Sequence, residues 1–305
     1  MDINIQNNLT VFGTSPFASS GTTTPSSGIQ SLWGSLSGIN NIIMAPTTGG
    51  GPSCGCFGFP STHHGFNSRP TGLQGSNIFG QFGGWGSDFQ SAFGGPGRDL
   101  IRQHGGPGSD FQRALGGRHA DTLIQRGGYG HDTQVARGGR GHDLIRQHGG
   151  PGHDFQKARG GPGHDLIRQR GGRGSDVQIA RGGRGSDHIV QRGGRGPDVQ
   201  VARGGRGNDV IRQHGGPGSD RSIARGGRGN DKLVYRAGRG KDTAVLNGGR
   251  GNDRAVIRAG NKNIKVTDAK GKVLYQQGDG SSLVKVKNVE NLLIKGKGGR
   301  TLYNC

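Results

Sequence analysis

"RGGRGNDVIRQHGGPGSDRSIARGGRGND", residues 203–231, decides the fold, because one short motif recurs in it at a fixed spacing. A Gly-Gly pair opens a new unit every eleven residues, and an aspartate closes the same six-residue stretch, GGxGxD, each time. Glycine adopts positive φ at little cost, so GGxGxD predicts a turn. The five residues that follow each aspartate are enough for a short strand.

The same unit fills the middle of the chain. Residues 83–258 are sixteen units of eleven residues without insertion or deletion, and only Ala237-Gly238 departs from the Gly-Gly pair. A fixed period of this kind predicts a solenoid, in which each unit is stable only when it is stacked on its neighbours.

Hydrophobic alternation predicts which side chains face inward. The second and fourth positions after each aspartate carry no charge in any unit, so we expect them to face the interior. Two kinds of inward pair alternate: an aliphatic residue then Gln, as in Ile211/Gln213, and Gln then Ala, as in Gln200/Ala202. The repeat is therefore 22 residues with two strands per coil. We predict an all-β fold, a right-handed parallel β-roll or β-solenoid, with glutamine amides bonded along its axis.

The flanking regions differ in composition from the repeats. Residues 1–82 are rich in Gly, Ser and Thr, which predicts a disordered leader. Within it, "GIQSLWGSLSGINNIIM" (28–44) is either a short amphipathic helix or, given its glycines, a weak helix or none. Residues 259–305 have more apolar residues in alternation, which predicts a small β-rich C-terminal cap over the open sheet edges.

Charge and hydrophobicity narrow the function classes. Only 28% of the 305 residues are hydrophobic, too few for two ordinary cores, and the net charge is +20. Such a charge favours anionic polysaccharide, lipopolysaccharide or nucleic acid as a partner. There is no apolar run long enough for a transmembrane helix, and the N-terminus lacks the features of a Sec signal peptide. No nucleophile–base pair or phosphate loop is evident, so we predict that the protein is not an enzyme.

The turn motifs are similar to those of a known family. GGRGND, GGRGSD and GGPGHD resemble the RTX (haemolysin-type) calcium-binding repeat, whose consensus is GGxGxDxUx with an aliphatic residue at U. "LVKVKNVENLLIKG" (283–296) resembles the segment that closes such repeat blocks, so the resemblance covers about residues 83–305. It implies a secreted, extracellular bacterial protein with a structural or adhesive role. The Ser/Thr/Asn-rich N-terminus resembles a type III secretion leader, which would make the protein an effector, so we expect export by a type I or type III route.

The resemblance also implies calcium sites. In the family, Ca²⁺ lies between successive turns, held by the aspartate and by backbone carbonyls, in keeping with its need for six to eight oxygens. Asp121 and Asp198 match less well, because His119 and Pro197 interrupt their turns. The implied ligands are Asp88, Asp99, Asp110, Asp132, Asp143, Asp154, Asp165, Asp176, Asp187, Asp209, Asp220, Asp231, Asp242 and Asp253.

Abundant arginine departs from the family pattern and leaves alternatives open. The arginines could pair with the aspartates and hold the turns without metal. They could also make a calcium-independent solenoid that binds polyanions. One set precedes Gly-Gly: Arg126, Arg137, Arg159, Arg170, Arg181, Arg192, Arg203, Arg225 and Arg236. The other lies third in the turn: Arg140, Arg173, Arg184, Arg195, Arg206, Arg228, Arg239 and Arg250.

Two histidine or cysteine groups are weaker candidates. Cys54, Cys56, His63 and His64 could hold Zn²⁺ or Cu, but their spacing fits no usual zinc module. One turn position carries histidine in four successive units, either as plain surface residues or as a pH-sensitive or metal-binding edge. These histidines are His131, His142, His153 and His164.

Overall fold

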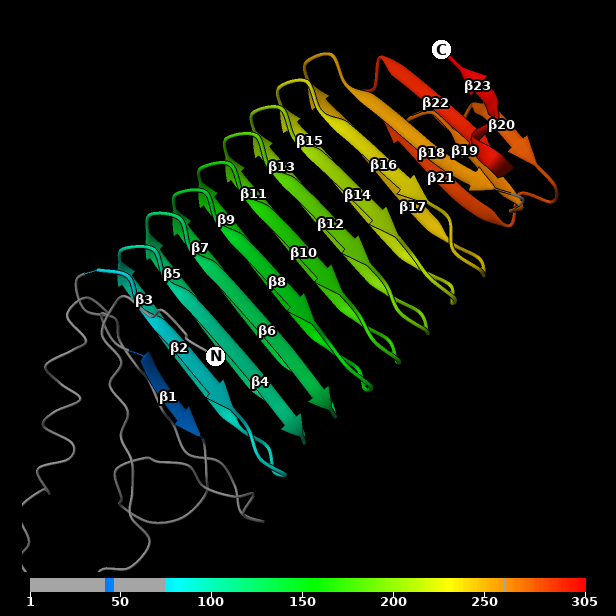
Figure 1. Ribbon diagram of the computed structural model, residues 1–305. Coiled ribbons are helices and arrows are strands. Elements are labelled where there is room, and N and C mark those ends of the chain that lie inside the picture. Colours follow the sequence, from blue (N-terminus) through cyan, green and yellow to red (C-terminus); the bar gives the residue numbers. More distant parts are fainter. Residues whose placement is uncertain (1–41, 47–74, 261) are drawn as a thin grey trace, which may run out of the picture.

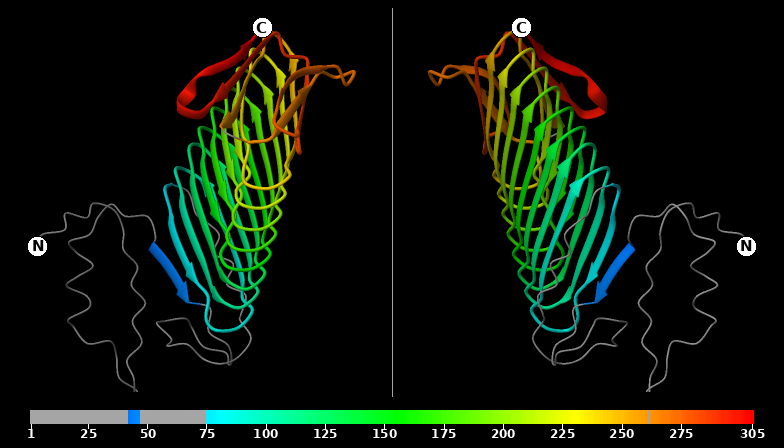
Figure 2. Two further views of the ribbon diagram at one scale, coloured as in Figure 1. Left: turned by 90° about the vertical axis from the view of Figure 1, so that its right-hand side faces the viewer. Right: turned by 90° about the vertical axis from the view of Figure 1, so that its left-hand side faces the viewer.

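The computed structural model describes residues 42–46, 75–260 and 262–305, and it confirms the predicted fold class. The chain forms a parallel β-solenoid of about nine turns with a 22-residue spacing (Figure 1). Two sheets face each other, one of 12 strands (sheet A) and one of 11 (sheet B). Figure 2 shows the flattened coils edge-on, with the C-terminus at the far end of the stack.

Strands alternate between the two sheets along the chain. Sheet A contains β1 (Ile42–Pro46), β2 (Ile78–Phe82), β4 (Leu100–Pro107), β6 (Thr122–Tyr129), β8 (Leu144–His148), β10 (Leu166–Arg170), β12 (His188–Arg192), β14 (Val210–His214), β16 (Lys232–Arg236), β18 (Arg254–Gly260), β22 (Asn291–Gly296) and β23 (Thr301–Asn304). Sheet B contains β3 (Phe89–Pro96), β5 (Phe111–Arg118), β7 (Thr133–Arg140), β9 (Phe155–Pro162), β11 (Val177–Arg184), β13 (Val199–Arg206), β15 (Arg221–Arg228), β17 (Thr243–Arg250), β19 (Ile264–Thr267), β20 (Val273–Gln277) and β21 (Ser282–Lys287).

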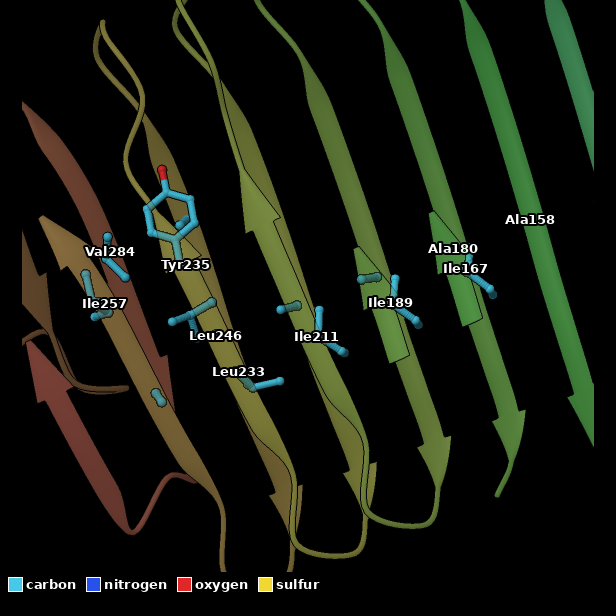
Figure 3. Close-up of a cluster of buried hydrophobic side chains, with 14 of the residues drawn as sticks. Ala158, Ile167, Ala180, Ile189, Ile211, Leu233, Tyr235, Leu246, Ile257 and Val284 are labelled. Atoms are coloured by element: carbon cyan, nitrogen blue, oxygen red, sulfur yellow. The ribbon is translucent and has the colours of Figure 1, made fainter. Parts of the chain in front are cut away.

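The predicted inward positions form the core. Ile167, Ile189 and Ile211 occupy the same register in successive strands of sheet A and are fully buried (Figure 3). Ala180 and Ala202 do the same in sheet B. Because aliphatic residues line one sheet and alanines the other, the two sheets approach closely and bury these side chains completely.

Two columns of glutamine fill the rest of the interior. Within sheet A, Gln169 Nε2 donates to Gln147 Oε1 one coil earlier, at 2.7 Å. In sheet B, Gln156 Nε2 donates to Gln134 Oε1 at 3.1 Å. The amides also cross the interior, as where Gln169 Nε2 donates to the Gln156 carbonyl at 3.2 Å. These bonds confirm the predicted amide columns and satisfy polar groups that would otherwise be costly to bury.

The solenoid begins before residue 83. β2 pairs with β4 in parallel, and Phe79 and Gln81 take the two inward positions of a coil. β1, in turn, pairs with β2 in parallel, so a segment expected to be disordered adds a strand to sheet A. An amphipathic helix therefore does not extend into residues 42–46; the remaining predictions for 1–41 and 47–74 lie outside the described residues.

The predicted C-terminal cap contains a further coil of the solenoid. β21 pairs in parallel with β17, and β22 with β18, which extends both sheets by one strand. β20 then pairs antiparallel with β19, and β23 antiparallel with β22. These antiparallel strands cover the sheet edges that the last coil would leave exposed.

Candidate functional site

Two edges join the sheets, and each carries one column of aspartates. Turns that lead from sheet A to sheet B form the A-to-B edge, with aspartates every 22 residues from Asp88 to Asp242. Turns that lead from sheet B to sheet A form the B-to-A edge, with Asp99 to Asp253 at the same spacing. Every one of these aspartates is at most 5% exposed, so the carboxylates lie inside the corners of the coil.

From Asp99 onward, one carboxylate oxygen of each aspartate accepts a hydrogen bond from the backbone of the preceding coil. The amide of Asp143 donates to Asp165 Oδ1 at 2.9 Å, and that of Asp165 donates to Asp187 Oδ1 at 2.8 Å. Along both columns these distances are 2.7–3.0 Å. A carboxylate that accepts a backbone N–H forms a strong, charge-assisted bond, so each aspartate fixes the spacing of two coils.

The columns include residues that the sequence motif did not identify. Asp121 and Asp198, which match the motif less well, accept the same bond, at 2.8 Å from Asp99 N and Asp176 N. Asn77 opens the B-to-A column, its amide donating to Asp99 Oδ1. Ser282 and Glu290 close the columns by accepting from Asp242 N and Asp253 N. The inward pair Phe79 and Gln81 would have identified Asn77 as the residue at the aspartate position. Ser282 and Glu290 do not follow the 22-residue spacing, so the sequence pattern does not identify them.

The second carboxylate oxygen distinguishes the two edges. On the A-to-B edge, Asp154 Oδ2 accepts the N–H of Gly150 at 2.8 Å, four residues earlier in its own turn. The same bond is made in other turns of that edge by Asp88, Asp132, Asp176, Asp198 and Asp242. On the B-to-A edge, within the described residues, Oδ2 of each aspartate of the column is buried without a hydrogen-bond partner.

The second glycine of the turn explains this difference. On the B-to-A edge it has positive φ, as at Gly161 (144°) and Gly183 (150°), and Asp165 and Asp187 lack the Oδ2 bond. On the A-to-B edge, Gly106 (117°) and Gly216 (138°) also have positive φ. Their aspartates, Asp110 and Asp220, are the ones on that edge whose Oδ2 has no partner among the described residues. The glycine conformation therefore decides whether its N–H reaches the carboxylate.

Burial of these carboxyls raises their pKa. Burial is the largest cause throughout, and the charges of adjacent coils add to it; the backbone N–H bonds act in the opposite direction. The pKa of Asp121 rises to about 8, and those of Asp110, Asp187, Asp209 and Asp220 to about 7. All of these lack the Oδ2 bond. The pKa of Asp198 and Asp154, which accept from Gly194 and Gly150, rises to about 6. The pKa of Asp143 and Asp231, which lack the Oδ2 bond, also rises to about 6, so the bond alone does not set the value.

The fourteen implied calcium ligands do not offer equal donor sets. Thirteen of them, from Asp99 onward, use Oδ1 to accept a backbone amide, so at most their Oδ2 is free for a cation. That oxygen lies over the first glycine of the turn, where a Cβ on Gly193 would be 2.4 Å from Asp198 Oδ2 and 2.1 Å from the Gly215 carbonyl of the next coil. Within the described residues, no three His, Cys, Asp or Glu side chains form a metal-binding group. A calcium ion would depend on backbone carbonyls, and the unpartnered Oδ2 atoms fit it better than those bonded to glycine.

Arginine does not hold the aspartates. Among the described residues, the columns accept their hydrogen bonds from backbone amides, with side-chain additions from Asn77 and Tyr235, and no ion pair joins arginine to aspartate. The interpretation in which Asp–Arg pairs stabilise the turns is therefore wrong. Its physical reason is that the aspartates face the interior while the arginines occupy alternate, outward positions.

A second, outward column lies one residue before each aspartate. His142 Nδ1 accepts the amide of His164, and His164 Nδ1 accepts that of Ser186, at 2.8 and 2.7 Å. The rings of His131 and His153 stack with centroids 5.0 Å apart, as do those of His142 and His164. Serine and asparagine accept the equivalent amide in other coils, as Asn208 Oδ1 does from Asn230 N. The four histidines thus act as turn acceptors.

Exposed arginines form two adjoining columns on the B-to-A edge. At the ends of the sheet B strands, Arg137, Arg159, Arg181, Arg203 and Arg225 lie in unbroken register. At the third turn position lie Arg184, Arg206, Arg228 and Arg250. A groove of about 990 Å³ is lined by residues of both columns, with glycine, Pro162 and Asn288 and without an acidic or aromatic side chain.

Comparison of the chain with protein families, curated proteins and solved structures gives no match. In the part that the structure describes, no helix has both the length and the apolar character needed to span a bilayer. The function has to be argued from the two edges themselves.

Proposed function

We propose that the protein is a calcium-independent scaffold whose B-to-A edge binds a linear acidic polysaccharide. The observation that carries this is the pair of arginine columns along one groove with no acidic residue in its lining. Parallel strands lie about 4.8 Å apart, so like charges repeat at that interval. Bound anions would relieve the repulsion between them, and guanidinium binds carboxylate or sulfate groups in bidentate fashion.

Polysaccharide is favoured over nucleic acid because the groove supplies no stacking surface. Single-stranded nucleic acid binding draws much of its energy from bases that stack on aromatic side chains. None lines this groove. Among the exposed aromatic residues, Trp85 and Tyr129 lie on turns of the A-to-B edge, and Phe93 lies in the register of Arg137 but two strands before it, outside the groove. A rod with charges at a constant interval suits a polymer that also repeats its charges.

The test is binding of a heparin oligosaccharide to the full chain across a range of salt concentrations, with EGTA present. The variant Arg206→Gln/Arg228→Gln should bind about tenfold more weakly, with the salt slope reduced by about one per arginine. Arg113→Gln, on the outer face of sheet B, is the matched control and should change affinity little. Binding that ignores salt, or a single-stranded oligonucleotide that binds more tightly than heparin, would overturn the proposal.

Calcium binding is the second candidate, and the unpartnered Oδ2 atoms favour it. An ion beside them would neutralise carboxylates that burial otherwise drives toward protonation. In that case the protein would resemble an RTX repeat protein, exported in low calcium and folded outside the cell. Calcium titration followed by calorimetry and circular dichroism tests it: unchanged stability and spectrum in EGTA would exclude a structural role for calcium.

A further inference from the structure

The outer face of sheet A carries a second basic column, which differs from the B-to-A edge because histidine interrupts it. The strand ends place Arg126, His148 and Arg170 in register on three successive strands. Arg192, His214 and Arg236 repeat the arrangement further along. Each histidine is thus flanked by an arginine on either side, one strand away.

A groove accompanies this column. About 590 Å³ in volume, it runs beside Arg126, His148 and Arg170, is lined by residues of β6, β8, β10, β12 and β14, and has no acidic side chain in its lining. His214 and Arg236 line a separate groove of about 760 Å³, which also has no acidic side chain in its lining. Arg146, Arg168 and Arg212 contribute from the middle of their strands. Arg212 Nη1 lies 3.0 Å from His188 Nε2, so neutral His188 accepts from this arginine. Cations dominate the surface.

The surroundings of the two flanked histidines disfavour the imidazolium form. The pKa of His148 is lowered by burial first and then by Arg170 and Arg126, with buried Asp176 acting in the opposite direction. Burial lowers the pKa of His214 in the same way, with Arg236 and Arg192 adding to it and Asp242 opposing. Both groups therefore remain neutral beside a dense array of positive charge.

We propose that this face is a second binding site for the acidic polysaccharide and that it takes up protons on His148 and His214 when the ligand binds. Sulfate or carboxylate groups beside Arg126, Arg170, Arg192 and Arg236 offset the charges that disfavour imidazolium. By linkage, the proton and the anion then favour each other's binding. Binding at this face therefore strengthens as the pH falls, whereas the B-to-A groove, lined by arginine, binds independently of pH.

The inference rests on the proposed function for its ligand class but on different residues for its site. Calorimetry of a heparin oligosaccharide with the full chain, in two buffers of different ionisation enthalpy, measures proton uptake directly. We expect uptake of about one to two protons near neutral pH and about tenfold tighter binding at pH 5.5 than at pH 8.

His148→Gln/His214→Gln should abolish most of the uptake and of the pH dependence while leaving binding at pH 8 unchanged. His153→Ser is the control, because serine already serves as the acceptor at this turn position in neighbouring coils; it should keep both effects. Arg206→Gln/Arg228→Gln should weaken binding at every pH without changing uptake. Uptake that is zero, or that survives the double histidine variant, overturns this inference alone; no binding at any pH overturns the proposed function as well.

Discussion

The two edges of the solenoid are built from one sequence motif and yet differ in chemistry. On the A-to-B edge most aspartates receive two backbone N–H bonds, whereas on the B-to-A edge each described aspartate receives one. The difference originates in the φ of the second glycine, which is positive throughout the B-to-A edge and only at Gly106 and Gly216 on the other. The same sequence motif can therefore give two different hydrogen-bonding environments for its carboxylate, because glycine permits both backbone conformations.

The largest expected effect is the dependence of the free energy of unfolding on pH. Folding raises the pKa of carboxyls on both edges from 3.8, to about 8 for Asp121 and about 7 for Asp187 and Asp209. A raised folded-state pKa contributes stability below the unfolded value and loses it as the pH rises through the folded value. The free energy of unfolding should therefore fall by several kcal/mol, in order of magnitude, between about pH 4 and pH 8.

Urea denaturation at a series of pH values measures this effect. Three histidines have a lowered pKa in the folded state: His148, His188 and His214. They reduce the free energy of unfolding at pH values below the ordinary histidine pKa. The pH of maximum stability should therefore be weakly acidic. A stability that rises steadily to pH 9 would contradict the buried, unpaired carboxylates. If calcium occupies the B-to-A edge, millimolar calcium should remove the loss at alkaline pH, because the ion favours the ionised form.

Replacement of one aspartate by alanine separates the two edges. Asp154→Ala leaves two buried amides, Asp132 N and Gly150 N, without an acceptor; Asp165→Ala leaves one, Asp143 N. Each lost acceptor costs about 1–3 kcal/mol, so we expect Asp154→Ala to destabilise by roughly twice as much near pH 5. Chemical denaturation of both variants tests this. Equal losses would show that the Gly150 bond contributes nothing to the A-to-B edge.

Replacement of an aspartate by asparagine should stabilise the protein or leave its stability unchanged on the B-to-A edge, and destabilise it on the A-to-B edge. Asp165→Asn keeps the Oδ1 acceptor and removes an ionisable group, so at pH 8 it should be neutral or stabilising by about 1 kcal/mol. Asn77 sets the precedent, since its Nδ2 donates to the Gly75 carbonyl at 2.9 Å. Asp154→Asn instead presents an NH₂ group to Gly150 N–H and should destabilise by about 1–2 kcal/mol. Thermal unfolding at pH 8 compares them, and destabilisation by both would contradict the comparison.

The regular part of this architecture could be predicted from the sequence because the period is unbroken. Ile211 and Gln213 revealed their inward positions by the absence of charge, and the 22-residue coil followed. The same alternation, extended one step back to the aspartate, would also have placed Asp209 inside. The resemblance to a calcium-binding turn predicts a ligand role for Asp209, whereas in the structure its Oδ1 accepts the backbone amide of Asp187.

The irregular parts could not be predicted in the same way. Ser282 and Glu290 continue the columns after a hairpin that breaks the period, so no spacing identifies them. Whether Gly150 donates to Asp154 depends on one φ angle, and the motif GGxGxD is identical on both edges. The placement of charge on the strands was predicted more fully: Arg203 and Arg225, each fifth after its aspartate, lie outward as the alternation indicated.

The smallest predicted effect concerns the one described turn of the repeat in which a non-glycine residue has positive φ. His119 (φ 77°) stands where the next coil has Gly141. His119→Gly removes backbone strain of about 1–2 kcal/mol but increases the entropy of the unfolded chain and loses the bond that His119 Nδ1 accepts from Gly97 N. We expect a net stabilisation of about 0.5 kcal/mol, measured by urea denaturation.

Gly141→Ala is the matched control for this substitution. Gly141 has φ 122°, and a Cβ there would lie 2.0 Å from the His119 carbonyl, so alanine forces the coils apart. It should destabilise by more than about 2 kcal/mol. Both substitutions act on the B-to-A edge. Comparing their effects on stability therefore shows whether the glycine backbone conformation or the side-chain acceptor contributes more to the stability of that edge. If His119→Gly were the more damaging of the two, the bond that His119 Nδ1 accepts from Gly97 N, and not the glycine conformation, would determine how the coils stack there.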